Sequence, residues 1–153
     1  MGVEILVRKT AARLLRKNIS QRDLKRITRI LLNDLECRTT ELSLLLTDDD
    51  EISVLNAQYR NKPVPTDVLS FSLREGDYAE YCQNVLGDIV ISVATAARNA
   101  TLRDESLRNE IVRLLIHGLL HLVGCEHEGV SKSIANKMKR EERRLYEVVK
   151  SVR

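Results

Sequence analysis

All three histidines of this 153-residue chain lie close together, at His117, His121 and His127. Residues four positions apart on an α-helix share one face and lie one turn apart, so His117 and His121 could bind the same metal ion. Gly124 follows where a helix could end, and His127 could then supply a third ligand from the turned chain. Three nitrogen ligands leave one tetrahedral position open, which is typical of a catalytic rather than a structural zinc site.

The spacing of these histidines is that of a class of zinc peptidases, with one difference. In those enzymes the residue after the first histidine is a glutamate that serves as the general base, whereas here it is Gly118. A glycine has no side chain that could accept a proton. The sequence therefore predicts the metal site of a zinc hydrolase and disfavours a peptidase.

The composition bounds the class of protein. With 43% hydrophobic and 31% charged residues, the chain is typical of a soluble globular protein with one domain. No stretch approaches the roughly 20 apolar residues of a membrane span, and the first residues lack the apolar core of a signal peptide. The three widely spaced cysteines do not indicate a disulfide framework. We therefore expect one cytoplasmic domain over residues 1–153, with no membrane partner.

The net charge of +3 is unevenly distributed. Residues 1–30 contain nine basic (Lys/Arg) and two acidic residues. Residues 31–100 contain five basic and twelve acidic residues, and residues 101–153 contain eleven basic and eight acidic residues. Basic ends around an acidic middle predict a positive region of the surface, which would attract a polyanion such as a nucleic acid. The alternative is a charged helix face that is simply solvated.

Hydrophobic periodicity predicts the elements that must position the histidines. We expect strands at residues 3–7, 41–47, 66–73 and 85–92, and helices at 21–36, 49–60, 93–102, from 104 or 105 to about 123, and 131–149. Residues 8–20 are interpreted as a basic connector and residues 74–84 as a surface loop. This order predicts an α/β or α+β fold, with a mixed sheet of about four strands covered by about five helices.

Several polar residues have a structural and a functional interpretation. The acidic run Asp48–Glu51 could be a metal cluster, but acids favour the start of a helix, and we interpret it so. Asp67 and Asp88 could orient a histidine or accept a proton, or could simply cap the ends of strands. Gly87 within a strand predicts a bulge or a close approach of another backbone.

The sequence resembles the YbeY endoribonuclease family. The matching motifs span about residues 50–130 in the family's order and are Asn56-x-x-Tyr59-Arg60, Pro65-Thr66-Asp67-Val68-Leu69-Ser70-Phe71, Leu86-Gly87-Asp88-Ile89, and His117-Gly118-Leu119-Leu120-His121-Leu122-Val123-Gly124 with His127. Two departures stand out: Cys125-Glu126 replaces the family's common Tyr-Asp, and Ser72 stands where the family often has proline. These departures concern the position of the loop rather than the ligands.

The resemblance implies a single-domain fold with a zincin-like metal site and one zinc ion per chain. It implies that His117, His121 and His127 are the zinc ligands and that Arg60 is important for activity. It further implies a zinc-dependent, single-strand-specific endoribonuclease that acts on ribosomal RNA of the small ribosomal subunit, at the 3′ end of 16S RNA, and in ribosome quality control.

The residues themselves leave alternatives open. The guanidinium of Arg60 could bind a phosphate through two parallel hydrogen bonds, or Arg60 could be a cation favoured at the end of a helix. Three classes of function follow: a metal-dependent ribonuclease, a zinc peptidase disfavoured by Gly118, and a ribosome-assembly factor whose zinc is structural.

Overall fold

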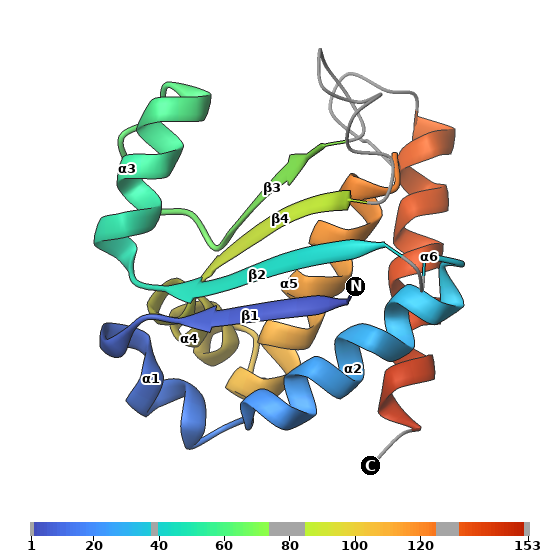
Figure 1. The fold of residues 1–153 in the computed structure, drawn as a ribbon, viewed down its shortest axis with the longest axis horizontal. Helices are drawn as coiled ribbons and strands as arrows, with labels where there is room; N and C mark the ends of the chain where they lie inside the picture. The colour runs from blue at the N-terminus through green and yellow to red at the C-terminus, as the bar shows by residue number, and fades with distance from the viewer. Residues whose placement is uncertain (1, 38–39, 74–84, 125–131, 152–153) are drawn as a thin grey trace.

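The computed structural model describes residues 2–37, 40–73, 85–124 and 132–151. These residues form a single α+β domain (Figure 1). The strands are β1 (Val3–Val7), β2 (Glu41–Thr47), β3 (Val68–Ser72) and β4 (Val85–Ser92), and the helices are α1 (Lys9–Arg16), α2 (Gln21–Asp34), α3 (Asp49–Arg60), α4 (Val93–Leu102), α5 (Leu107–Leu122) and α6 (Lys132–Lys150). None of these helices combines the length and the apolar character needed to cross a membrane.

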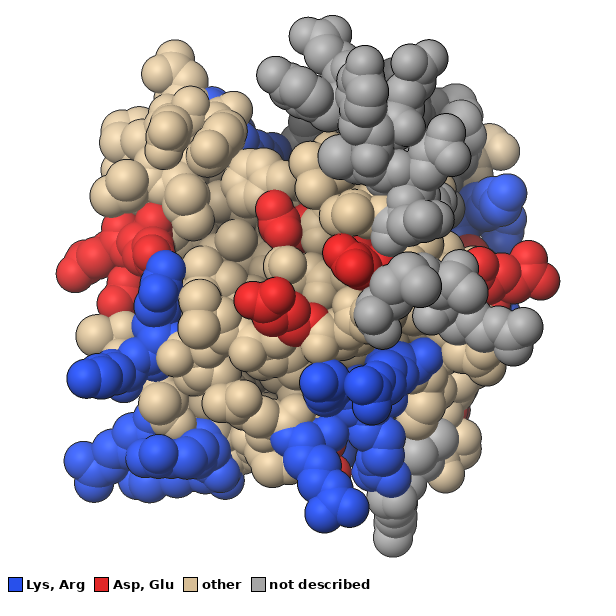
Figure 2. Space-filling view, in the orientation of Figure 1, with Lys and Arg blue, Asp and Glu red and all other residues tan. Residues whose placement is uncertain are grey.

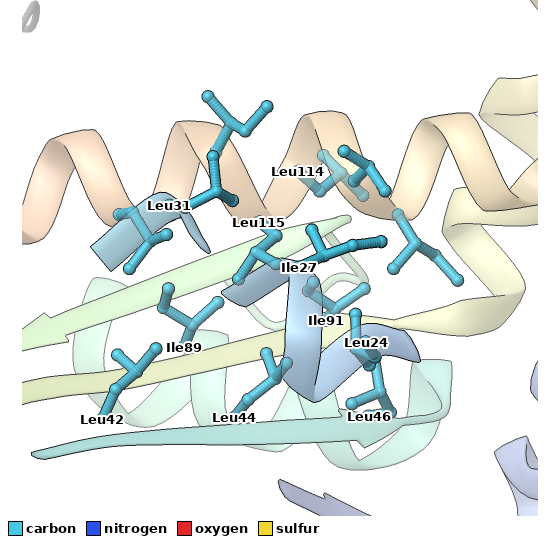
Figure 3. Close-up of a cluster of buried hydrophobic side chains, with 14 of the residues drawn as sticks. Leu24, Ile27, Leu31, Leu42, Leu44, Leu46, Ile89, Ile91, Leu114 and Leu115 are labelled. Atoms are coloured by element: carbon cyan, nitrogen blue, oxygen red, sulfur yellow. The ribbon is translucent and has the colours of Figure 1, made fainter. Parts of the chain in front are cut away.

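The sheet is mixed, as expected, with the strand order β1-β2-β4-β3. Strands β1, β2 and β4 are parallel, and β3 pairs antiparallel with β4 at one edge. The main core lies between one face of this sheet and helices α2 and α5, where leucine and isoleucine side chains of both layers meet (Figure 3). Helix α3 packs on the opposite face through Ile52, which contacts Leu69 and Val90.

Helix α1 is a correction to the predicted basic connector at residues 8–20, and it raises the number of described helices from the expected five to six. Its apolar stripe is short, because only Ala11 and Leu15 are buried. No side chain caps its first turn, since Arg8 stands at the N-cap position. A helix of eight residues with two buried positions and no cap leaves too little periodic signal in the sequence.

The other boundaries follow from helix caps. The Ser20 hydroxyl accepts a hydrogen bond from the Asp23 amide at 3.0 Å, and the Asp48 carboxylate accepts one from the Glu51 amide at 2.8 Å. The interpretation of the acidic run as a helix start is thus confirmed. Helix α5 begins slightly later than expected, because Ser106 caps it. The predicted loop at residues 74–84 lies outside the described residues.

Asp49 joins the start of α3 to the junction of β4 and α4. Its carboxylate accepts hydrogen bonds from Ser92 at 2.7 Å, Thr95 at 2.5 Å and Arg98 at 2.7 Å. Burial raises the pKa of Asp49, but the hydrogen bonds from Thr95, Ser92 and Arg98 outweigh it, so the pKa lies below its ordinary value. The folded state therefore favours the ionised carboxylate.

Replacing Asp49 with alanine is expected to lower the free energy of unfolding by about 1–3 kcal/mol at pH 7, because three donors lose a charged acceptor. Because the pKa of Asp49 is lower in the folded state than in the unfolded state, its ionised carboxylate stabilises the fold at pH values above the unfolded pKa of about 3.9. This contribution is lost as the pH falls through the folded pKa. The difference between wild type and Asp49→Ala should therefore shrink below about pH 4. Urea unfolding from pH 3 to 7 tests this, with Asp50→Ala as the matched control, since Asp50 is exposed in the same turn. Equal losses in both variants would contradict the role of Asp49.

Candidate metal site

Helix α5 carries the histidines and approaches the sheet through Gly118. A Cβ atom at this position would lie only 3.0 Å from Cδ1 of Ile89 on β4. The carbonyl oxygen of Gly118 also accepts a hydrogen bond from the Ser70 hydroxyl of β3 at 3.5 Å. The missing side chain therefore lets the helix pack closely on the sheet. Gly118 occupies the sequence position of the general base of zinc peptidases, and a side chain there would point into the core rather than towards the histidines.

His117 and His121 present their outer ring nitrogens to each other. Their Nε2 atoms are 3.1 Å apart, and their ring centroids are 4.6 Å apart with planes inclined by 69°. Both rings are partly buried, so their polar atoms are only partly solvated. Two imidazole nitrogens converging on one point form part of the donor set that zinc prefers. The expected placement of both rings on one face of the helix is therefore confirmed, whereas their binding of a metal stays a prediction.

The inner nitrogen of His117 contacts a carboxylate from another helix. Nδ1 of His117 lies 2.7 Å from Oε1 of Glu142 on α6. A hydrogen on Nδ1 donates to this carboxylate, which leaves the lone pair of Nε2 directed towards His121. Metal-ligating histidines commonly have such a partner, which fixes the tautomer and makes the ring a better ligand. The residues present thus fit a metal ion.

Glu142 is a site residue that sequence reasoning missed, although a signal was available. On α6 the residues Met138, Leu145 and Val149 are buried, at 1%, 0% and 6% exposure. Glu142 lies four positions after Met138 and three before Leu145, and therefore on the same inward stripe. A carboxylate within an inward stripe requires a partner, and here the partner is His117.

The third predicted ligand, His127, lies outside the described residues. Within the described parts of the chain, no group of three His, Cys, Asp or Glu side chains is arranged to hold a metal ion. The three-histidine metal site therefore stays a prediction.

Arg60 reaches the same edge of the sheet from the opposite face. It is exposed in the last turn of α3, where its neighbour Tyr59 packs edge-to-face on Phe71 of β3 with ring centroids 5.0 Å apart. The preceding residue on β3, Ser70, contacts the carbonyl of Gly118 beside His117. Strand β3 thus joins the helix end that carries Arg60 to the helix that carries the histidines.

The predicted strand carboxylates have structural contacts. Asp67 accepts a hydrogen bond from the Val68 amide at 2.8 Å and one from Asn99 at 3.2 Å, so it caps the start of β3. Asp88 alternates with Ile89 and therefore projects from the sheet face away from α5, where burial raises its pKa and a Ser43 hydrogen bond partly offsets that effect.

Gly87 confirms the predicted irregularity in its strand. Its φ angle is +148°, and a side chain there would collide with the carbonyl oxygen of Phe71. The pairing of β2 with β4 also shifts register between Glu41 and Leu42, opposite this position.

An ion pair between a buried carboxylate and a partly exposed arginine lies one turn before the histidines. Glu110 is 1% exposed, and both of its oxygens accept hydrogen bonds from Arg113, at 3.0 and 2.6 Å. Both residues line a cavity of about 570 Å³ between α5 and α6, to which Glu142 and Tyr146 also contribute. Hydrogen bonding to Glu110, stronger than the opposing effect of burial, raises the pKa of Arg113. This pair fixes the polar stripe of α5 that continues to His117.

Replacing Glu142 with alanine is expected to weaken zinc binding about 10–100-fold, because His117 loses the partner that orients its ring. Glu142→Gln should lose less, since its amide oxygen can still accept from Nδ1. Competition with a chromophoric zinc chelator measures the affinity without any activity assay. Glu147→Ala is the control, because Glu147 is an exposed carboxylate on the same helix. Equal zinc affinity in the Glu142 and Glu147 variants would contradict this role.

Comparison with known proteins shows which family this chain matches. Residues 7–150 match the sequence model of the family described as "Endoribonuclease YbeY". A protein of that name from Syntrophotalea carbinolica is 39% identical over 130 residues, covering 85% of this chain and 87% of the relative. One from Syntrophus aciditrophicus is 41% identical over 128 residues, covering 84% and 80%. The solution structure of TM1509 from Thermotoga maritima superposes with a TM-score of 0.60 at 28% identity, covering 96% of this chain and 88% of that one.

Proposed function

This chain belongs to the YbeY endoribonuclease family, and we propose that it is a zinc-dependent, single-strand-specific endoribonuclease formed by one domain over residues 1–153. Its substrate would be ribosomal RNA of the small ribosomal subunit, processed in the cytoplasm at the 3′ end of 16S RNA and during ribosome quality control. The observation that carries the proposal is the convergence of the Nε2 atoms of His117 and His121, 3.1 Å apart, in a chain that matches the family.

The metal would be held by His117 and His121, with His127 as the expected third ligand. When bound, the zinc ion supplies Lewis acidity towards a phosphoryl oxygen. Glu142 holds the ring of His117 and keeps its Nδ1 protonated. Gly118 supplies no general base, which fits a substrate that brings its own nucleophile, as RNA does with its 2′-hydroxyl.

Arg60 would bind the phosphate next to the cleaved bond. Guanidinium groups form two parallel hydrogen bonds with phosphate oxygens and keep their charge at all physiological pH values. The contact of Tyr59 with Phe71 fixes the helix turn that carries Arg60 on the edge strand beside α5. This position supports an approach of Arg60 to the RNA from the face opposite α5.

Replacing Arg60 with alanine is expected to lower the rate of RNA cleavage about 100-fold or more, because a positioned charge that stabilises the transition state is lost. Zinc content and melting temperature should stay as in wild type. The assay is cleavage of a fluorescently labelled single strand, and Lys62→Ala is the control because Lys62 is an exposed cation close to the end of the same helix.

Two outcomes of the cleavage assay would contradict parts of this proposal. Cleavage by Arg60→Ala at the wild-type rate would contradict the role of Arg60. Cleavage that also persists in His121→Ala would point to a contaminating nuclease and favour an assembly factor with a structural zinc.

A further inference from the structure

Lysine and arginine side chains gather over helices α1 and α2 (Figure 2). We call this region the basic surface, and its members are Lys9, Arg13, Arg16, Lys17, Arg22, Lys25, Arg26 and Arg29. Only two acidic residues, Glu4 and Asp23, occur in the first thirty residues. The charge asymmetry of the sequence thus becomes one localised region of the folded chain.

The cations of α2 form a stripe beside a groove. Arg22, Lys25, Arg26 and Arg29 follow the spacing i, i+3, i+4, i+7 and therefore lie on one face of the helix. Together with Ile30 and Asn33 they line a groove of about 490 Å³. A concave surface lined by four cations is suited to a chain of negative charges.

Most of these cations take no part in holding the fold together. Within the part of the chain that the structure describes, Arg13, Arg16, Arg22, Lys25 and Arg29 are in no ion pair. Asp23, the acid within this surface, lies 3.7 Å from Arg26 and 3.8 Å from Arg108. Like charges that are not neutralised repel each other, so the cluster costs stability unless a polyanion binds to it.

Other arginines of the protein behave differently. Arg98 lies 2.7 Å from Asp49, and Arg144 lies 2.7 Å from Asp34. These contacts join separate elements and so have a structural role. Unlike Arg98 and Arg144, most cations of α1 and α2 are in no such ion pair with the described residues, which indicates that the basic surface binds a ligand.

The chemistry of the surface favours a nucleic-acid backbone as its partner. Residues 9–34 contain no aromatic side chain, so bases have nothing to stack on. Contacts from Lys and Arg to phosphates position a nucleic acid without reading its sequence. The surface therefore fits a phosphate backbone of any sequence.

The start of α2, where the cationic stripe begins, lies near the start of α5, whereas the histidines lie near the end of α5. Asp23 of α2 contacts Arg108, which is near the start of α5, and His121 follows thirteen residues later. At 1.5 Å per residue the helix places these ends about 20 Å apart. We propose that the basic surface binds the sugar–phosphate backbone of the RNA substrate about 20 Å from the cleaved bond. This inference rests on the proposed endoribonuclease function.

The test compares two triple variants that remove the same charge. Arg22→Gln/Lys25→Gln/Arg29→Gln removes the stripe on α2, and Lys137→Gln/Arg140→Gln/Lys150→Gln removes three exposed cations of α6. Glutamine has nearly the helix propensity of Lys and Arg, so both variants should fold, and melting temperatures verify this. Both are made in a His121→Ala background so that the RNA stays intact, and binding is measured by fluorescence anisotropy at several salt concentrations.

For a long single-stranded RNA, the α2 variant is expected to bind about tenfold more weakly near physiological salt, and the slope of log K against log salt should fall by about 2. The α6 variant should bind like the parent. With His121 restored, both variants should cleave a short oligonucleotide that cannot span about 20 Å with the same KM, because such a substrate occupies the metal site without reaching the basic surface. With His121 restored, the α2 variant should show a raised KM and an unchanged kcat on the long RNA.

Several results would overturn the inference. The α2 variant could bind the long RNA like the parent, or the α6 variant could lose as much affinity and slope as the α2 variant. If either occurs while the wild-type protein cleaves RNA, the proposed RNA-binding role of the basic surface is wrong and the proposed function stands. If the wild type cleaves no RNA but its binding depends on the α2 cations, the docking surface is supported and the proposed function fails.

Discussion

Replacing His121 with alanine is expected to abolish zinc binding and to lower RNA cleavage by about 10³-fold or more. The variant removes one of the two nitrogens that converge 3.1 Å apart on α5. A Lewis acid contributes several kcal/mol to stabilising charge in the transition state, and each 1.36 kcal/mol corresponds to about tenfold in rate. Metal analysis and a single-turnover cleavage assay on the same preparation measure both effects.

A control separates loss of the ligand from damage to the fold. With a chelator present, wild type and His121→Ala should melt at nearly the same temperature, because neither holds metal. Added zinc should then raise the melting temperature of wild type alone, since a ligand that binds only the folded state stabilises it. An equal zinc-induced increase in His121→Ala would contradict the role of His121.

Replacing Gly118 with glutamate is expected to unfold the protein, although this change restores the zinc-peptidase motif. The new Cβ would lie 3.0 Å from Ile89, inside the interface between α5 and β4. A carboxylate forced into this core costs several kcal/mol through burial of charge, in addition to steric overlap, out of a total stability of about 5–15 kcal/mol. Soluble yield and urea unfolding measure the effect.

The alanine variant provides a graded control for this prediction. Gly118→Ala introduces only the Cβ atom, and the end of the Ile89 side chain can move, so the expected loss is about 1–3 kcal/mol. A Gly118→Glu protein that unfolds at the same urea concentration as wild type would show that this position does not face the core. If it also gained peptidase activity, the helix would be rotated relative to the structure.

The parts of the fold predictable from the sequence were those with local signals. The cap at Ser20, the acidic helix start at Asp48 and the apolar runs of β2 and β4 all act within a few residues. The histidine pair was predictable for the same reason, because a spacing of four on a helix fixes the geometry of both rings. In each case the residues that determine the structure are neighbours in the chain.

The features that the sequence did not reveal depend on distant residues or weak local signals. Glu142 contacts His117 from a helix 25 residues away. The helix turn of Arg60 is connected to the helix of the histidines only through the packing of Tyr59 on Phe71 and the contact of Ser70 with Gly118. Helix α1 lacks a cap and depends on two buried residues, so tertiary packing decides its conformation. Gly118 indicated a missing base, and only the structure gave the reason, which is the approach of Ile89.

The most direct test of the account is the metal content of protein purified without chelator, measured beside His117→Ala. We expect about one zinc ion per chain in wild type and none in the variant, because His117 supplies one of the two converging nitrogens. Well-folded wild-type protein that contains no metal, and binds none when zinc is added back, would contradict the central claim that these histidines form a metal site.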